Sequence, residues 1–196
     1  MKFILGFLFF LSVIGLSLYG FKYSIEGQKK QIKRALTPPP NLSIETIQGK
    51  HLPTQKIVDD DTLLGIDHNH NGIRDDIELK IFETYKNPIK RAILLQSSRA
   101  HQRMLTDPYL LRNAKYWEKS SSKYIDCIGY LYENKKIQKM DRNIVQTVSE
   151  WQYNNKKRVK QYLDYNNALS GGVYSIKDGT LQDCEFDVED ILKIKE

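Results

Sequence analysis

Apolar side chains recur at helical spacing over most of the chain after residue 75, and this periodicity strongly limits the possible folds. The stripes are, in order, Ile77, Ile81 and Tyr85; Ile89, Ala92, Ile93, Ala100 and Met104; Leu110, Ala114, Trp117, Tyr124, Ile128 and Leu131; and Ile144, Val148, Trp151, Asn155, Val159 and Tyr162. Four such stripes with short connections predict an all-α fold, an antiparallel bundle of about four helices.

Capping residues separate the stripes. Asn87-Pro88 should end one helix and open the next, because Asn can cap a helix and Pro fits its first turn. Asp107-Pro108 repeats this pattern and predicts the start of the third helix. Asp141 should cap the fourth helix, and Gly171-Gly172 should end it. A further short helix is expected within residues 187–194.

Oxygen-bearing side chains alternate along residues 67–78, DHNHNGIRDDIE, just before the first helix. Such spacing lets a chain curl around a hard divalent cation, which takes roughly six to eight oxygen ligands. We therefore predict a Ca²⁺ site, with Gly72 permitting the turn. The expected ligands are the side chains of Asp67, Asn69, Asn71, Asp75 and Glu78 and the carbonyl of Ile73. The alternative is a polar turn that only caps the following helix.

Two histidines, His68 and His70, lie within the same stretch. At these positions of a calcium loop the side chains point away from the ion, so we expect them to face solvent. A site for a softer metal, built from both histidines and a nearby carboxylate, is the alternative.

The loop resembles that of the EF-hand family over about twelve residues. It departs from that pattern at Arg74, where an aliphatic residue is usual, and Pro53 and Gly65 precede it instead of an evident entering helix. It is more similar to the isolated loops of dockerin and thrombospondin type 3 repeats, which implies a structural ion rather than a sensor. With YNNALSGGVYS (residues 165–175), GIDHNHNGIRDDIE (residues 65–78) also resembles a group of small exported bacterial proteins. This resemblance implies export and a calcium-dependent helical fold, but no activity.

Residues 3–21 carry no charge, and this run is long enough to cross a bilayer as a helix. It could instead be a signal peptide, with a weak cleavage site after Ser17. A Lys-rich stem and the prolines at 38–40 follow and favour an extended spacer. We predict a signal anchor or signal peptide (1–23), a basic stem and Pro-rich linker (24–52) with a short extended segment at 42–47, and a calcium-loop helical domain (53–196).

Cys127 and Cys184 are the only cysteines, and in an exported protein an even pair predicts a disulfide. Two buried, reduced thiols are the alternative. A bond over this separation would contribute about 4 kcal/mol to stability. It would also hold the acidic end of the chain against the helices.

Charge is unevenly distributed. Residues 79–160 contain 18 basic and 7 acidic side chains, whereas residues 161–196 contain 3 basic and 8 acidic ones. We expect the acidic end to fold back and compensate the basic helices, and we expect no nucleic-acid partner. The alternative is that helices 79–160 bind anionic lipid or nucleic acid.

Two features of the sequence give conflicting indications of the cellular compartment. Basic residues after the apolar run outnumber those before it, which would keep the domain in the cytoplasm by the positive-inside rule. The cysteine pair and the calcium loop favour an oxidising, calcium-rich compartment. We expect a periplasmic or other extracytoplasmic domain anchored to the inner membrane, or a secreted one if the N-terminal segment is cleaved.

No catalytic motif accompanies the loop. We therefore expect a non-enzymatic structural or partner-binding role in the cell envelope, with a partner that the sequence does not identify. The alternative is an envelope hydrolase whose active site is assembled from helix residues without a recognisable motif.

Overall fold

The computed structural model describes residues 40–53, 62–137, 142–174 and 178–194. The predicted membrane or signal segment and the basic stem lie outside these ranges, as does Asp141, the predicted helix cap. The described residues belong to one compact unit that begins at Pro39.

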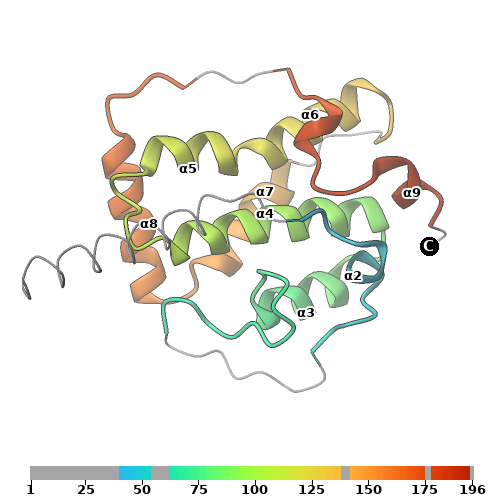
Figure 1. Ribbon diagram of the computed structural model, residues 1–196, viewed down its shortest axis with the longest axis horizontal. Coiled ribbons are helices and arrows are strands. Elements are labelled where there is room, and N and C mark those ends of the chain that lie inside the picture. Colours follow the sequence, from blue (N-terminus) through green and yellow to red (C-terminus); the bar gives the residue numbers. More distant parts are fainter. Residues whose placement is uncertain (1–39, 54–61, 138–141, 175–177, 195–196) are drawn as a thin grey trace, which may run out of the picture. The chain divides into compact units, whose positions relative to one another are not determined.

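The described part of the chain is helical and contains no strand, which confirms the all-α prediction (Figure 1). The helices are α2 (Ile44–Gln48), α3 (Asp75–Thr84), α4 (Pro88–Thr106), α5 (Ala114–Ser121), α6 (Lys123–Glu133), α7 (Arg142–Gln152), α8 (Lys156–Leu169) and α9 (Val188–Leu192), with the 3-10 turn η1 at Leu181–Asp183.

Helix α4 occupies the centre and packs against α2, α3, α5, α6, α7 and α9 (Figure 1). Its start matches the sequence prediction: Asn87 accepts a hydrogen bond from the Lys90 N–H (3.1 Å), and Pro88 is the first helical residue. Because other elements surround α4, apolar and polar side chains are both buried along it. Ala92, Leu94 and Leu95 are fully buried beside Gln96, Ser97, Ser98 and Arg99.

His101 is a buried histidine on α4. Its Nδ1 lies 2.7 Å from the Tyr153 hydroxyl, and the two rings meet edge to face. Burial lowers the pKa of His101 to about 4, because the protonated imidazole would lose its hydration there. His101 is therefore neutral in the folded domain near neutral pH.

The third predicted helix differs from expectation. Asp107 ends α4 instead of opening a helix, and its buried carboxylate accepts bonds from the Tyr109 N–H (2.8 Å), the Asn113 amide (2.8 Å) and the Trp117 indole (2.6 Å). These contacts hold residues 108–113 in a turn, and helix resumes at Ala114. The apolar face predicted for this helix is nevertheless buried. It is shared between two helices, α5 and α6, which are separated by Ser122.

The fourth predicted helix is also two helices. Asn155, predicted on an apolar stripe, instead caps α8 by accepting a hydrogen bond from the Arg158 N–H (2.9 Å). Val159, assigned to the same stripe, is 39% exposed. Helix α8 ends just before Gly171, as predicted.

The segment predicted to be extended contains helix α2 at Ile44–Gln48. Ser43 caps α2 by accepting a hydrogen bond from the Thr46 N–H (3.2 Å), and Leu42 and Ile47 are core residues. The cap and the burial of one helical face outweigh the short extended pattern. This stretch therefore belongs to the folded domain, which begins earlier than the predicted boundary at residue 53.

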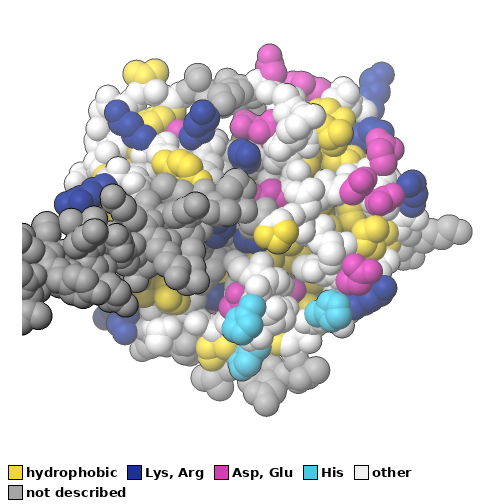
Figure 2. Space-filling model, in the orientation of Figure 1, with side chains coloured by type: hydrophobic (Ala, Val, Ile, Leu, Met, Phe, Trp, Pro, Cys, Tyr) yellow, Lys and Arg dark blue, Asp and Glu magenta, His cyan; other side chains and the backbone are white. Residues whose placement is uncertain are grey.

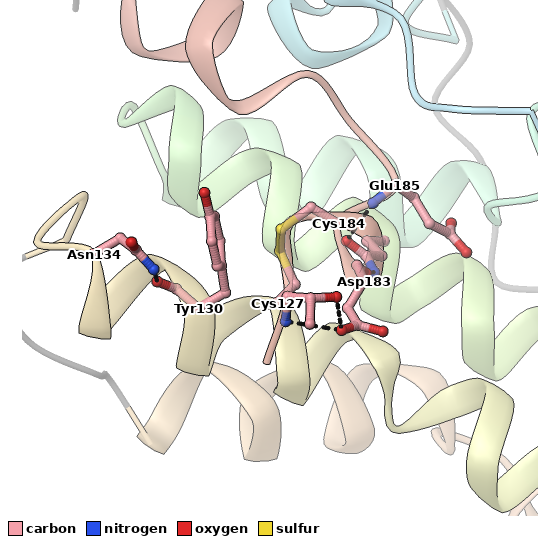
Figure 3. The surroundings of a disulfide bond; sticks show 8 residues. Cys127, Tyr130, Asn134, Asp183, Cys184 and Glu185 are labelled. Atoms are coloured by element: carbon pink, nitrogen blue, oxygen red, sulfur yellow. Dashed lines mark hydrogen bonds between the residues drawn. A yellow bond between two sulfur atoms is a disulfide. The ribbon is translucent and has the colours of Figure 1, made fainter. Parts of the chain in front are cut away.

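The acidic end of the chain packs across α4 and α6. A disulfide joins Cys127 on α6 to Cys184, with 57 residues of separation (Figure 3). Arg99 pairs with Glu185 (2.6 Å), and Lys136, just after α6, pairs with Glu189 (2.9 Å). Short helix α9 follows, capped by Asp187, within the range predicted for it. These contacts confirm that the acidic segment compensates part of the basic charge of the helices.

Candidate metal site

The backbone of the 67–78 loop is curled by its own side chains. The Asp67 carboxylate accepts hydrogen bonds from the N–H groups of Asn71 (3.2 Å) and Gly72 (2.9 Å). The Asn71 side-chain oxygen accepts one from Ile73 (2.8 Å). Gly72 has φ +83°, a left-handed conformation that a side chain would strain. The turn is thus built from contacts within the loop itself.

Polar side chains of the loop converge on Glu78 in the first turn of α3. The amide groups of Asn69 and Asn71 donate to its two carboxylate oxygens, at 3.0 and 2.9 Å. Burial raises the pKa of Glu78 to about 7, and the nearby negative charges of Asp75 and Asp67 add to the effect. Burial also raises the pKa of Asp67. The loop therefore concentrates negative charge in a poorly hydrated place, where a cation would be stabilised.

Asp75 is arranged differently from the other predicted ligands. It is fully buried, and its carboxylate lies 2.6 Å from His68 Nδ1 and accepts a hydrogen bond from the His68 backbone N–H (3.1 Å). His68 and His70 are exposed, as expected, and Figure 2 shows histidines on the surface over this part of the molecule. The contact between His68 and Asp75 was not predicted.

Of the six predicted ligand residues, Asp67, Asn69, Asn71 and Glu78 are linked by hydrogen bonds within the loop, whereas Asp75 is paired with His68. The side chain of Ile73 is fully buried in the core. Within the described residues, no three side chains of Asp, Glu, His or Cys form a ready metal-binding cluster. The available donor set instead mixes amide oxygens with carboxylates, which suits a hard cation such as calcium rather than zinc.

The loop is held to the rest of the domain by Arg74, which sequence reasoning treated only as a departure from the family pattern. Its side chain is 1% exposed and donates to the Asp76 carboxylate (2.8 and 2.6 Å). It also donates to the backbone carbonyls of Gln152 (3.0 Å) and Trp151 (3.3 Å) at the end of α7. A cation placed against helix-terminal carbonyls stabilises them. Arg74 thereby joins the loop to α7.

A second buried arginine, Arg158 of α8, holds the segment before the loop. It is fully buried, and its Nε donates to the Leu63 carbonyl (3.1 Å). Gln102 on α4 donates to the Leu64 carbonyl (2.5 Å) and accepts from Gln152 (2.8 Å). Residues 62–66 are not helical, so no helix enters the loop directly, as expected. Side chains from α4, α7 and α8 replace it as the support.

One groove is described on the surface, at the start of α8, with a volume of about 800 Å³. Its described lining includes lysines, asparagines and Tyr153, but no carboxylate, histidine or cysteine. A hydrolase site would need such groups, so the groove gives no support to the hydrolase alternative.

Comparisons with protein-family models, curated proteins and solved structures gave no match to this chain. In the part of the chain that the structure describes, no helix is both long and apolar enough to cross a membrane. The geometry of the loop and its supports is therefore the basis for inferring function.

Proposed function

We propose that the chain is an exported, membrane-tethered domain whose 67–78 loop binds one structural Ca²⁺ ion, and that it has a structural or partner-binding role in the cell envelope. In this proposal a membrane or signal helix, a proline spacer and the calcium loop precede an antiparallel bundle formed by α3, α4, α5–α6 and α7–α8. Residues 1–23 provide the anchor in the inner membrane, or a cleaved signal if the domain is secreted.

The observation that carries the calcium proposal is the loop geometry. Asp67 and Gly72 shape the turn, and the carboxylate of Glu78 closes it opposite two asparagine side chains. Binding would require the amides of Asn69 and Asn71 to exchange their N–H contacts with Glu78 for oxygen contacts to the ion. The ion would neutralise carboxylates whose pKa values burial already raises. This charge compensation would stabilise the loop and, through Arg74, its junction with α7.

The proposal of a brace rather than a sensor follows from the supports of the loop. Residues 62–66, the described residues just before the loop, are not helical and offer no helix that could change its angle to α3, and Arg74 is buried against α7. Sensor loops work by moving such helices. Export is supported by the disulfide, which persists in oxidising compartments, and by the match between a low-charge ligand set and millimolar calcium.

Calcium titration of the full-length protein in detergent micelles tests the proposal. Calorimetry should show binding, and calcium at 100 times its dissociation constant should stabilise the fold by about 2.7 kcal/mol. Glu78→Gln should abolish both effects, because it removes the charge that closes the site. Glu83→Gln is the matched control, since Glu83 is exposed further along α3. Absence of both heat and stabilisation in the unmodified protein would refute calcium binding.

A further inference from the structure

Helix α8 presents a surface on which exposed apolar and basic side chains alternate. The groove of about 800 Å³ is lined by Lys156, Lys157 and Lys160, with Val159 and Leu163 among them. Val159 is 39% exposed and Leu163 58% exposed, and residues four apart lie on the same side of a helix. We call these five residues the α8 groove. Exposed apolar groups set among like charges indicate a surface that meets another molecule.

The helix dipole does not favour lysines at the start of α8. Lys156 and Lys157 occupy the first turn, where the helix dipole favours acidic residues, and the first turn of α8 has none. Lys160 forms an exposed pair with Asp164 (2.5 Å), which offsets little of this cost. A binding role for an anionic partner explains basic residues at this end of the helix.

Neither the acidic C-terminal segment nor the basic stem is a suitable occupant, and the acidic residues 59–61 lie outside the described residues. The acidic C-terminal segment is already packed against α4 and α6 through the Cys127–Cys184 bond and the pair between Arg99 and Glu185. The stem at residues 22–34 carries five basic side chains and one acidic one, so it would be repelled by the lysines. The lysines require an anionic occupant, and we take it to come from outside the chain.

A bilayer surface satisfies both kinds of group in the α8 groove. Lipid phosphates attract lysines near the surface, and the boundary with the acyl chains accepts apolar side chains. A soluble polyanion would leave Val159 and Leu163 exposed to water. The 18 residues between the apolar run and Pro40 reach at most about 60 Å, so the proposed tether keeps the domain near the membrane.

We propose that the α8 groove docks the domain onto the anionic surface of the bilayer to which the chain is tethered, with the lysines at the lipid phosphates and Val159 and Leu163 in the interfacial layer. This inference rests on the tether of the proposed function, but not on calcium binding.

Depth-dependent quenching in vesicles tests the docking. A fluorophore is attached through Asn166→Cys, at an exposed position of α8 beyond Leu163, or through Glu133→Cys at the exposed end of α6 as control. Both native cysteines are in the disulfide, so the added thiol is the one available for labelling. Full-length protein is reconstituted into vesicles of equimolar phosphatidylcholine and phosphatidylglycerol, or of phosphatidylcholine alone, with quencher-bearing lipid.

In anionic vesicles the probe at position 166 should be quenched more than the control probe at position 133. This quenching should decrease in neutral vesicles and at high salt. Lys156→Glu/Lys160→Glu should lower the docked-to-undocked ratio by at least roughly fivefold per residue changed. Lys115→Glu/Lys119→Glu, which changes exposed α5 residues with the same charge and spacing, should leave it unchanged. Circular dichroism verifies that each variant is folded.

Equal quenching at both positions, or equal loss in both charge-reversed variants, would overturn docking through the α8 groove. In lipid-free micelles, shielding of the probe at position 166 from solvent could increase with protein concentration. That result would also overturn the proposal, because it would show that a second copy of the chain covers the α8 groove. Release of the protein from vesicles by alkaline carbonate would refute the tether instead. A retained protein with an unquenched probe would refute docking alone.

Discussion

Replacing Arg74 with Met tests whether this side chain fastens the loop to α7. Met has a similar length and fills the space, but it donates no hydrogen bonds. The variant would lose the two bonds to Asp76 and would leave the Gln152 carbonyl without the donor that now lies 3.0 Å away. Residue Gln152 is fully buried, so water cannot readily replace that donor.

The expected loss can be estimated from burial. Removing one partner of a buried ion pair costs about 3–5 kcal/mol. The side chain of Asp76 is 24% exposed and can be partly rehydrated, which places the loss near the lower end, at about 3 kcal/mol. For a domain of this size each kcal/mol lowers the melting temperature by about 2–4 °C, so we expect a decrease of about 6–12 °C.

Urea and thermal unfolding, followed by circular dichroism, measure this effect with calcium and with a chelator. Arg112→Met at an exposed position is the control and should change the free energy of unfolding by less than about 0.5 kcal/mol. The Arg74→Met loss should appear in both solutions, because the bonds run to α7 and Asp76. A loss below about 1 kcal/mol, or one seen only with calcium, would refute a direct fastening role.

Three further predictions concern the disulfide, the buried histidine and the backbone beside Arg74. The double variant Cys127→Ala/Cys184→Ala should lower the free energy of unfolding by about 4 kcal/mol, because the disulfide no longer restricts the unfolded chain over a separation of 57 residues. Reduction of the disulfide in the unmodified protein should have a similar effect. Below the unfolded pKa of about 6.5, unfolded His101 binds a proton that the folded form, with its pKa of about 4, does not. The contribution of His101 to stability should therefore fall as pH decreases from about 6.5 to 4, and His101→Phe should remove a pH dependence of about 1.4 kcal/mol per pH unit. Gly65→Ala should cost more than about 1 kcal/mol, because φ is +71° there and the new Cβ would overlap the Arg74 side chain, and adding Arg74→Ala should recover part of that cost.

Denaturant titrations can contradict each of these three predictions. Equal stability of the oxidised and reduced proteins would contradict the first prediction. Parallel pH profiles for the unmodified protein and His101→Phe would show that the imidazole does not control this pH range. Strict additivity of Gly65→Ala and Arg74→Ala would indicate that the two residues do not compete for space.

Local sequence chemistry was enough to predict much of the secondary structure. The cap and proline at Asn87-Pro88 act on atoms within four residues, so the start of α4 follows from them directly. The turns of the 67–78 loop likewise involve hydrogen bonds to Asp67 from residues four and five positions away. The apolar stripe predicted for the third helix is also buried, although a turn at residues 108–113 and a break at Ser122 divide it.

Capping residues were misread where their alternative partners lie elsewhere. Asp107 has the composition of a cap before proline, but Asn113 and Trp117 satisfy its carboxylate inside a turn. Asn155 fell on an apolar stripe by spacing, yet the break in the helix makes it a cap. The sequence pattern records which residues can cap a helix, and packing selects the ones that do.

Long-range contacts decided the rest. The sequence marks Arg74 as a loop residue, but its carbonyl partner Gln152 is 78 residues away. Arg158 and Leu63 are 95 residues apart. A charged side chain can be buried only where such distant acceptors replace its hydration, and no local pattern specifies them. The sequence determined the helices, the curled loop and a cysteine pair able to bond, whereas only the tertiary structure decided what holds the loop in place and which face of α8 remains exposed.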